Sequence, residues 1–112
     1  MSWFDSAKKE FADLLNQEML SVENCGQKIY YRPVRAMNPI AADQYRKLAA
    51  EGGSNALIGI LILRARNADG TKMFSEDDRE DMKHKLSAQD IADVVTKMSK
   101  EGGVGNDTKP SM

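Results

Sequence analysis

This chain of 112 residues has one cysteine, one histidine and no excess of either charge. With Cys25 alone, no internal disulfide can form, which suits a reducing compartment. Sixteen basic residues against 17 acidic ones lack the basic excess typical of nucleic-acid-binding proteins. Metal clusters need more histidine or cysteine than this, and no serine or cysteine has a recognisable catalytic partner. We therefore expect no enzyme, no metal site and no nucleic-acid binding.

Long hydrophobic runs are also missing. The longest one, Leu57 to Leu63, is far shorter than the ~20 residues that span a bilayer. The first eleven residues contain acids and lysines where a signal peptide would be apolar. We expect a cytoplasmic protein without membrane contact, built as one domain because the chain is too short for two cores.

The apolar run itself organises the rest of the chain. It is interrupted only by Gly59, so no face is left for water, and it predicts an element buried at the centre of the fold. Its length fits either a helix or a buried strand. We favour a helix, because Ser54 supplies an N-cap and the segment continues into Arg64-Ala65-Arg66.

Two different patterns precede this centre. Residues 2–17 predict an amphipathic helix whose Phe and Leu face docks on the domain, the alternative being that this face binds a partner. Residues 18–34 predict a β-hairpin that turns at Gly26. Its second strand should be an edge or should end at Pro33, which cannot donate to a ladder.

Helix signals then recur through the rest of the chain. Asn38-Pro39 starts a helix that stops at Gly52-Gly53, and Ser75 and Ser87 each cap a later helix, the second through a capping box with Asp90. Apolar residues spaced for the core of the last helix are Ile91, Val94, Val95 and Met98. The fold class is mainly α (α+β): a compact helical domain of about four to five helices with a short N-terminal β-hairpin. We expect one globular domain over 1–101, with its helical core at 39–100, and a disordered tail at 102–112.

The turn before Ser75 partly matches a calcium loop. With Gly70 at the sixth position, Asn67, Asp69 and Glu76 fall where ligands belong. Ala65, however, stands where the first carboxylate is required, so calcium affinity should collapse. We expect an Asp-Gly turn before a capped helix, with a degenerate EF-hand-like calcium module as an alternative.

The order of features is more specific than any single motif. A strand ending in Tyr31-Arg32-Pro33-Val34 is followed by Asn38-Pro39, an apolar helix at 56–65, the run Asp69-Gly70-x-x-Met73-Phe74-Ser75-x-x-Asp78, and a helix pair ending in Met98-Ser99. Over roughly residues 18–100, this order resembles the small tail assembly chaperones of long-tailed (siphovirus-type) bacteriophages. The chain departs from the family in its long N-terminal helix with Trp3 and in the Asn-Ala pair before Asp69.

The resemblance implies a non-enzymatic protein without cofactors. Members of that family bind the tape-measure protein, keep its helical segments soluble and help to recruit tail-tube subunits. They act in the cytoplasm of the host bacterium and are not retained in the mature virion. Many of their genes also produce a longer form by ribosomal slippage near the end of the short reading frame.

Partner-binding residues are chosen as aromatic and arginine side chains, because these are the usual anchors of protein interfaces. The candidates are Trp3, Phe4, Phe11, Tyr30, Tyr31, Arg32 and Arg35. The N-terminal helix and an exposed edge strand would also permit a homo-oligomer. A minor structural head–tail or tail protein of a phage is the main alternative function.

Overall fold

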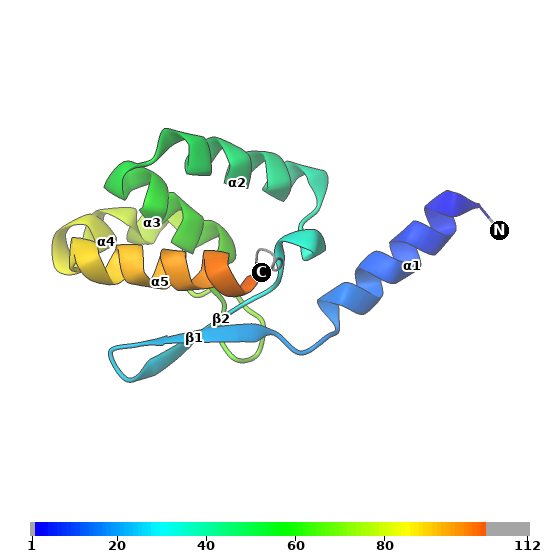
Figure 1. Cartoon of the computed structure of the whole chain (residues 1–112), viewed down its shortest axis with the longest axis horizontal. Helices are drawn as coiled ribbons and strands as arrows, with labels where there is room; N and C mark the ends of the chain where they lie inside the picture. The colour runs from blue at the N-terminus through cyan, green and yellow to red at the C-terminus, as the bar shows by residue number, and fades with distance from the viewer. Residues whose placement is uncertain (1, 103–112) are drawn as a thin grey trace, which may run out of the picture.

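The computed structural model describes residues 2–102, and the side chains of residues 2–100. Its elements are α1 (Trp3–Leu15), β1 (Leu20–Asn24), β2 (Gln27–Tyr31), η1 (Val34–Ala36), α2 (Pro39–Glu51), α3 (Gly53–Arg64), η2 (Glu76–Asp78), α4 (Arg79–Lys85) and α5 (Ala88–Gly102) (Figure 1). This confirms a compact helical domain with a β-hairpin near its N-terminus. The tail expected from residue 102 lies, beyond Gly102, outside the described residues.

Helix α3 is the centre of the fold, as its sequence predicts. It packs against α2, α4 and α5, and Ile58, Ile60 and Leu61 on its successive faces are all buried. The predicted cap is wrong, because the helix already begins at Gly53 and Ser54 lies inside its first turn. Gly52 both ends α2 and precedes α3, so no loop separates the two helices.

Helix α2 approaches α3 closely at a glycine. A Cβ atom on Gly59 would lie 2.8 Å from Leu48 Cδ2, so a larger residue there would require the Leu48 side chain to shift. The predicted N-cap of α2 is confirmed, because the amide N–H of Ala41 donates to Asn38 Oδ1 at 2.9 Å. Leu48 and Tyr45 pack partly buried against the core cluster.

The hairpin lies against α5. Strands β1 and β2 pair antiparallel from Leu20 opposite Tyr31 to the turn at Cys25 and Gly26. Both turn residues have positive φ, 53° and 76°, as a two-residue type I′ turn requires. Val22 joins the buried residues of α5, which are the four predicted, Ile91, Val94, Val95 and Met98.

The second strand is a less exposed edge than expected. Tyr30 and Arg66 exchange backbone hydrogen bonds of 3.1 and 2.7 Å, so the chain after α3 covers the outer side of β2. Tyr31 is 0% exposed and belongs to the hydrophobic core. Choosing Tyr31 as a partner-binding residue is therefore wrong, because strand alternation turns its ring inward.

The last two helices start near the predicted positions. The amide N–H of Ser75 donates to the Asp78 carboxylate at 2.8 Å, and a 3₁₀ turn, η2, precedes α4. Ser87 caps α5 by accepting from the amide N–H of Gln89, at 3.1 Å, and not through the predicted box with Asp90. No helix within residues 2–102 is long and apolar enough to cross a bilayer.

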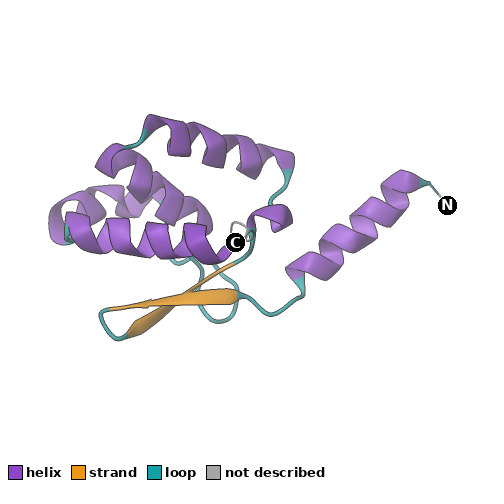
Figure 2. Ribbon diagram, in the orientation of Figure 1, coloured by secondary structure: helices purple, strands orange, loops and turns teal. Residues whose placement is uncertain are grey.

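Helix α1 stands away from the rest of the molecule. It extends from one end of the domain, and its first turns approach no other element (Figures 1 and 2). It contains no buried residue, and Trp3 and Phe4 are 81% and 60% exposed. The prediction that the Phe and Leu face of α1 docks on the domain is wrong, because only the last turns of α1 contact the rest of the domain, near η1.

Candidate functional site

The first candidate surface is the apolar stripe of α1. Phe4, Ala7, Phe11 and Leu14 follow one another at alternating steps of three and four residues, which places them on one side of the helix. Together with the neighbouring Trp3 and Leu15 they form what we call the α1 face. Its N-terminal half is open to solvent, whereas Phe11 and Leu14 are partly covered.

The other side of α1 is charged. Lys8 lies over the Phe4 ring, 4.6 Å from its centre, and 3.8 Å from the Asp5 carboxylate, so one charged side chain packs against the N-terminal end of the apolar stripe. An isolated helix of this length is marginally stable in water. A helix with one exposed apolar stripe gains most of its stability when another surface covers that stripe.

A pocket of about 270 Å³ lies at the base of this helix. Phe11 and Leu15 form one side of it, and further lining comes from η1, the start of α2 and the end of α3. We call this the basic pocket, because the charged side chains that line it are Arg32, Arg64, Arg66 and Lys72. Among the residues that the structure describes, no acidic side chain lines it.

Arg64 is the most buried charge of the described chain, with an exposed fraction of 4%. Its Nη2 donates to the carbonyl oxygen of Arg32 at 2.9 Å, and its guanidinium carbon lies 5.2 Å from the ring centres of both Tyr31 and Tyr45. Nε and Nη1 are buried without a hydrogen-bond partner. Burial lowers the pKa of Arg64, although the two tyrosines act in the opposite direction.

Two more arginines approach each other at the same place. Burial, and next the positive charge of Arg32, lower the pKa of Arg66. Arg32 Nε is buried without a partner, and its Nη2 would lie 3.1 Å from a Cβ atom on Gly70. The four cations of the basic pocket take part in none of the ion pairs between described residues.

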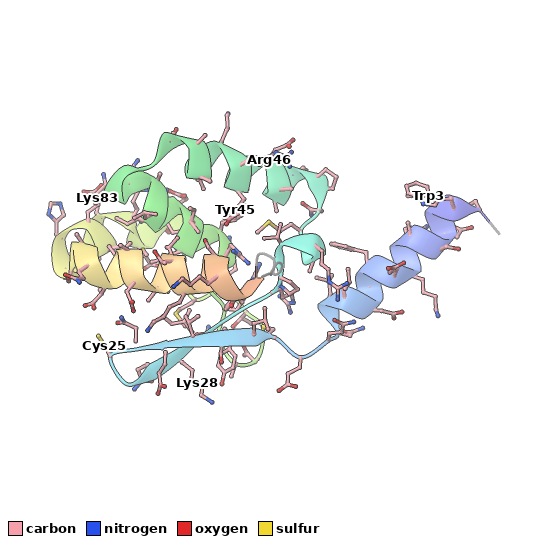
Figure 3. All side chains as sticks on the ribbon, in the orientation of Figure 1. Trp3, Cys25, Lys28, Tyr45, Arg46 and Lys83 are labelled. Atoms are coloured by element: carbon pink, nitrogen blue, oxygen red, sulfur yellow. The ribbon has the colours of Figure 1, made fainter. Side chains whose placement is uncertain are left out.

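The structure separates the predicted partner-binding residues into three groups. Trp3, Phe4 and Phe11 lie on the α1 face, and Trp3 stands at its free end in Figure 3. Tyr30 and Arg32 are half-buried near the end of β2, Tyr31 is in the core, and Arg35 is exposed on η1 outside the basic pocket.

Sequence reasoning missed the other cations of the pocket. Arg64 follows Ile60 and Leu61 by four and three residues, so a continuous α3 places it on the same buried side. That spacing was the available signal. For Arg66 and Lys72 there was none, because they meet only through an isolated bridge in the loop after α3.

The loop that resembles a calcium site is closed by its own hydrogen bonds. Asp69 Oδ1 accepts from the amide N–H and the hydroxyl of Thr71, at 3.0 and 2.7 Å. Glu76, the expected bidentate ligand, instead pairs with Arg79 at 2.9 Å. Within residues 2–102 no three acidic, histidine or cysteine side chains are placed to hold a metal ion.

Compared with models of protein families, with curated proteins and with solved structures, the chain matches none of them. Its function has to be inferred from its own residues. The α1 face and the basic pocket adjoin at Phe11 and Leu15, so they form one continuous candidate surface.

Proposed function

We propose that this protein is a non-catalytic tail assembly chaperone of a long-tailed bacteriophage. In this role it binds a helical segment of the tape-measure protein, keeps that segment soluble and helps to recruit tail-tube subunits. It acts in the cytoplasm of the host bacterium and is left out of the mature virion. The order of motifs over residues 18–100, which resembles this family, supports the proposal from the sequence side.

The observation that carries the proposal is the open α1 face. Its residues repeat with the spacing that packs one helix along another, so the matching client is a helix with an apolar stripe of its own. Fully burying Phe4 would contribute roughly 1.5–3 kcal/mol, and Trp3 a similar amount. Two heptads of such contacts give reversible binding, which suits a protein that must release its client.

The test is co-expression of the tagged chain with the tape-measure protein of the same phage. The variant Trp3→Ser/Phe4→Ser removes the open half of the α1 face, and Asp5→Ser/Lys9→Ser changes the opposite side of the same helix. We expect wild type and the control to retain soluble tape-measure protein, and the face variant to retain at least about tenfold less. Neither double variant touches the core, so both should keep the wild-type melting temperature.

Equal recovery of tape-measure protein by the face variant would show that α1 is not the client site. Purified virions provide an independent check. If the protein is found there in stoichiometric amount, it is a structural tail component, and the chaperone assignment is wrong.

A further inference from the structure

Some cations outside the basic pocket have carboxylate partners. In the groove on the other side of α3, Arg79 pairs with Glu76 at 2.9 Å and donates to Asn55 Oδ1 at 2.9 Å. On α5, Lys97 pairs with Asp93 at 3.0 Å. The four cations of the basic pocket take part in no ion pair between described residues. Three of them, Arg32, Arg64 and Arg66, are buried or half-buried, whereas unpaired cations elsewhere, such as Arg35, are exposed.

A cluster of unpaired, partly buried cations lowers the stability of the protein when no partner is bound. A buried charge is stabilised mainly by a counter-charge, whereas Arg64 contacts the Arg32 carbonyl oxygen, the rings of Tyr31 and Tyr45 and, through a side-chain hydrogen bond, Tyr45. Arg32 and Arg66 in addition repel each other. An anion placed in the pocket would offset both costs, and guanidinium groups bind oxyanions with two parallel hydrogen bonds.

Acids that share a hollow with Arg32 do not fill this role. Glu18 and Asp69 line a separate hollow that also includes Arg32, and neither takes part in an ion pair between described residues. The Glu76 carboxylate attracts Lys72 electrostatically, but Glu76 already forms an ion pair with Arg79. Within the described residues, the counter-charge is therefore missing, and a second molecule can supply it.

We infer that the basic pocket binds a carboxylate side chain of the client helix, so that the client must carry an acidic residue beside its apolar stripe. This inference rests on the proposed function and specifies its partner. Phe11 and Leu15 form an apolar side of the pocket that also belongs to the α1 face. An acidic side chain projecting from an apolar helix uses both features, whereas a free phosphate would leave the apolar side uncovered.

The position of the pocket fixes where this acid lies along the client. Phe4 and Phe11 are seven residues apart, which is ~10 Å along a helix at 1.5 Å per residue. The client acid therefore lies about two turns from the apolar residue that covers Phe4. It lies at the end of the client that packs on the last turn of α1.

Two synthetic helical peptides provide the probes. Both carry the same two-heptad Leu and Ala stripe, and they differ only in glutamate or glutamine at the flanking positions of one end. Trp3 is the only tryptophan of the chain and is 81% exposed, so its fluorescence reports binding to α1 directly. We expect the glutamate peptide to bind wild type at least about tenfold more tightly at low salt.

Two variants assign that preference to the pocket. Arg66→Gln/Lys72→Gln should reduce the ratio of the two affinities to about one, while binding of the glutamine peptide stays unchanged. Arg64→Met should have the same effect on the ratio without lowering the melting temperature. Arg35→Gln, an exposed arginine outside the pocket, should keep the wild-type ratio.

Three results would overturn the inference. If both peptides bind wild type equally, the pocket does not bind a carboxylate of the client, although the proposed function stands. If inorganic phosphate raises the melting temperature of wild type but not of Arg66→Gln/Lys72→Gln, and the peptides still bind equally, the pocket is a phosphate site. If neither peptide changes the Trp3 fluorescence, α1 does not bind apolar helices, and the proposed function fails as well.

Discussion

Helices α1 and α3 have almost the same length, 13 and 12 residues, but opposite surroundings. In α3 apolar residues occupy every face and are buried by α2, α4 and α5. In α1 they occupy one stripe, and nothing in the described chain covers its first two turns. Burial by the chain itself therefore stabilises α3, whereas α1 depends on a surface from another molecule.

The comparison shows what an amphipathic pattern does and does not specify. The spacing of Phe4, Phe11 and Leu14 says that one side of the helix needs cover, but not which chain supplies it. The rest of the domain meets α1 at the basic pocket, where Met37 and Leu63 lie beside the cations and face the same hollow as Phe11 and Leu15. This pocket reaches only the last turns of α1, so Trp3 and Phe4 at the other end of the helix stay exposed.

The largest expected difference between the two helices is in amide hydrogen exchange. Amides of α3 should exchange only through global unfolding, whose free energy is typically about 5 kcal/mol or more, and so at least ~1,000-fold more slowly than unprotected amides. Amides of α1 should show little protection, because an isolated helix of this length is marginal. Exchange monitored by NMR measures both. Slow exchange in α1 that depends on protein concentration would show instead that a second copy covers it.

Truncation of a buried side chain of α3 should have the next largest effect, with an exposed side chain of α2 as its control. Ile58 is 1% exposed, so Ile58→Ala should lower the free energy of unfolding by about 2–5 kcal/mol through lost burial and the cavity left behind. Ile40 is 73% exposed, and Ile40→Ala should change the free energy of unfolding by no more than about 0.5 kcal/mol. Urea unfolding followed by far-UV circular dichroism measures both variants. Similar losses would mean that α3 is not the centre of the folded core.

Much of the fold could be predicted from local signals. The run Leu57–Leu63 specified a buried central element and favoured a helix over a strand. Asn38-Pro39 specified the start of α2, and the spacing of Ile91 and Met98 specified the inner side of α5. Each of these depends on residues close together in the chain. The prediction that Ser54 caps α3 was wrong, because α3 already starts at Gly53, after Gly52, and has no side-chain cap.

The candidate site could be predicted only in part. Trp3 and Phe4 were chosen as aromatic anchors, but their exposure was not predicted, because the stripe that contains Phe4 was expected to dock on the domain. The basic pocket combines the end of α3, the loop after it and the end of β2, so it depends on tertiary packing. Tyr31 was misjudged for the same reason, because only the packed structure shows which side of β2 faces the core.

Removing the N-cap side chain of α2 or of α1 should have a smaller effect, and one that differs between the two helices. Asn38→Ala removes the acceptor for the Ala41 amide and should lower the free energy of unfolding by about 1 kcal/mol, or roughly 4–8 °C in melting temperature. Ser2 accepts from the Asp5 amide at 3.2 Å in the same way. Ser2→Ala should reduce only the helical circular dichroism signal of α1. An equal fall in melting temperature would show that α1 unfolds together with the body.

The smallest effect should appear at an exposed link between α5 and the hairpin. Asp93 accepts from Lys97 at 3.0 Å and from Asn24 at 3.1 Å, and these bonds hold the pKa of Asp93 below its usual value. Because the pKa is lower in the folded state, Asp93 stabilises the fold above the unfolded-state pKa, about 3.9, and loses this as pH falls through the folded-state value. Asp93→Asn should therefore melt lower than wild type at pH 7, by less than Asn38→Ala, and the difference should vanish towards pH 2. Asp77→Asn, which removes an exposed carboxylate without an ion pair among the described residues, should show no such convergence. A difference between Asp93→Asn and wild type that stays constant with pH would mean that the amide disturbs packing and that the carboxylate charge does not link the two elements.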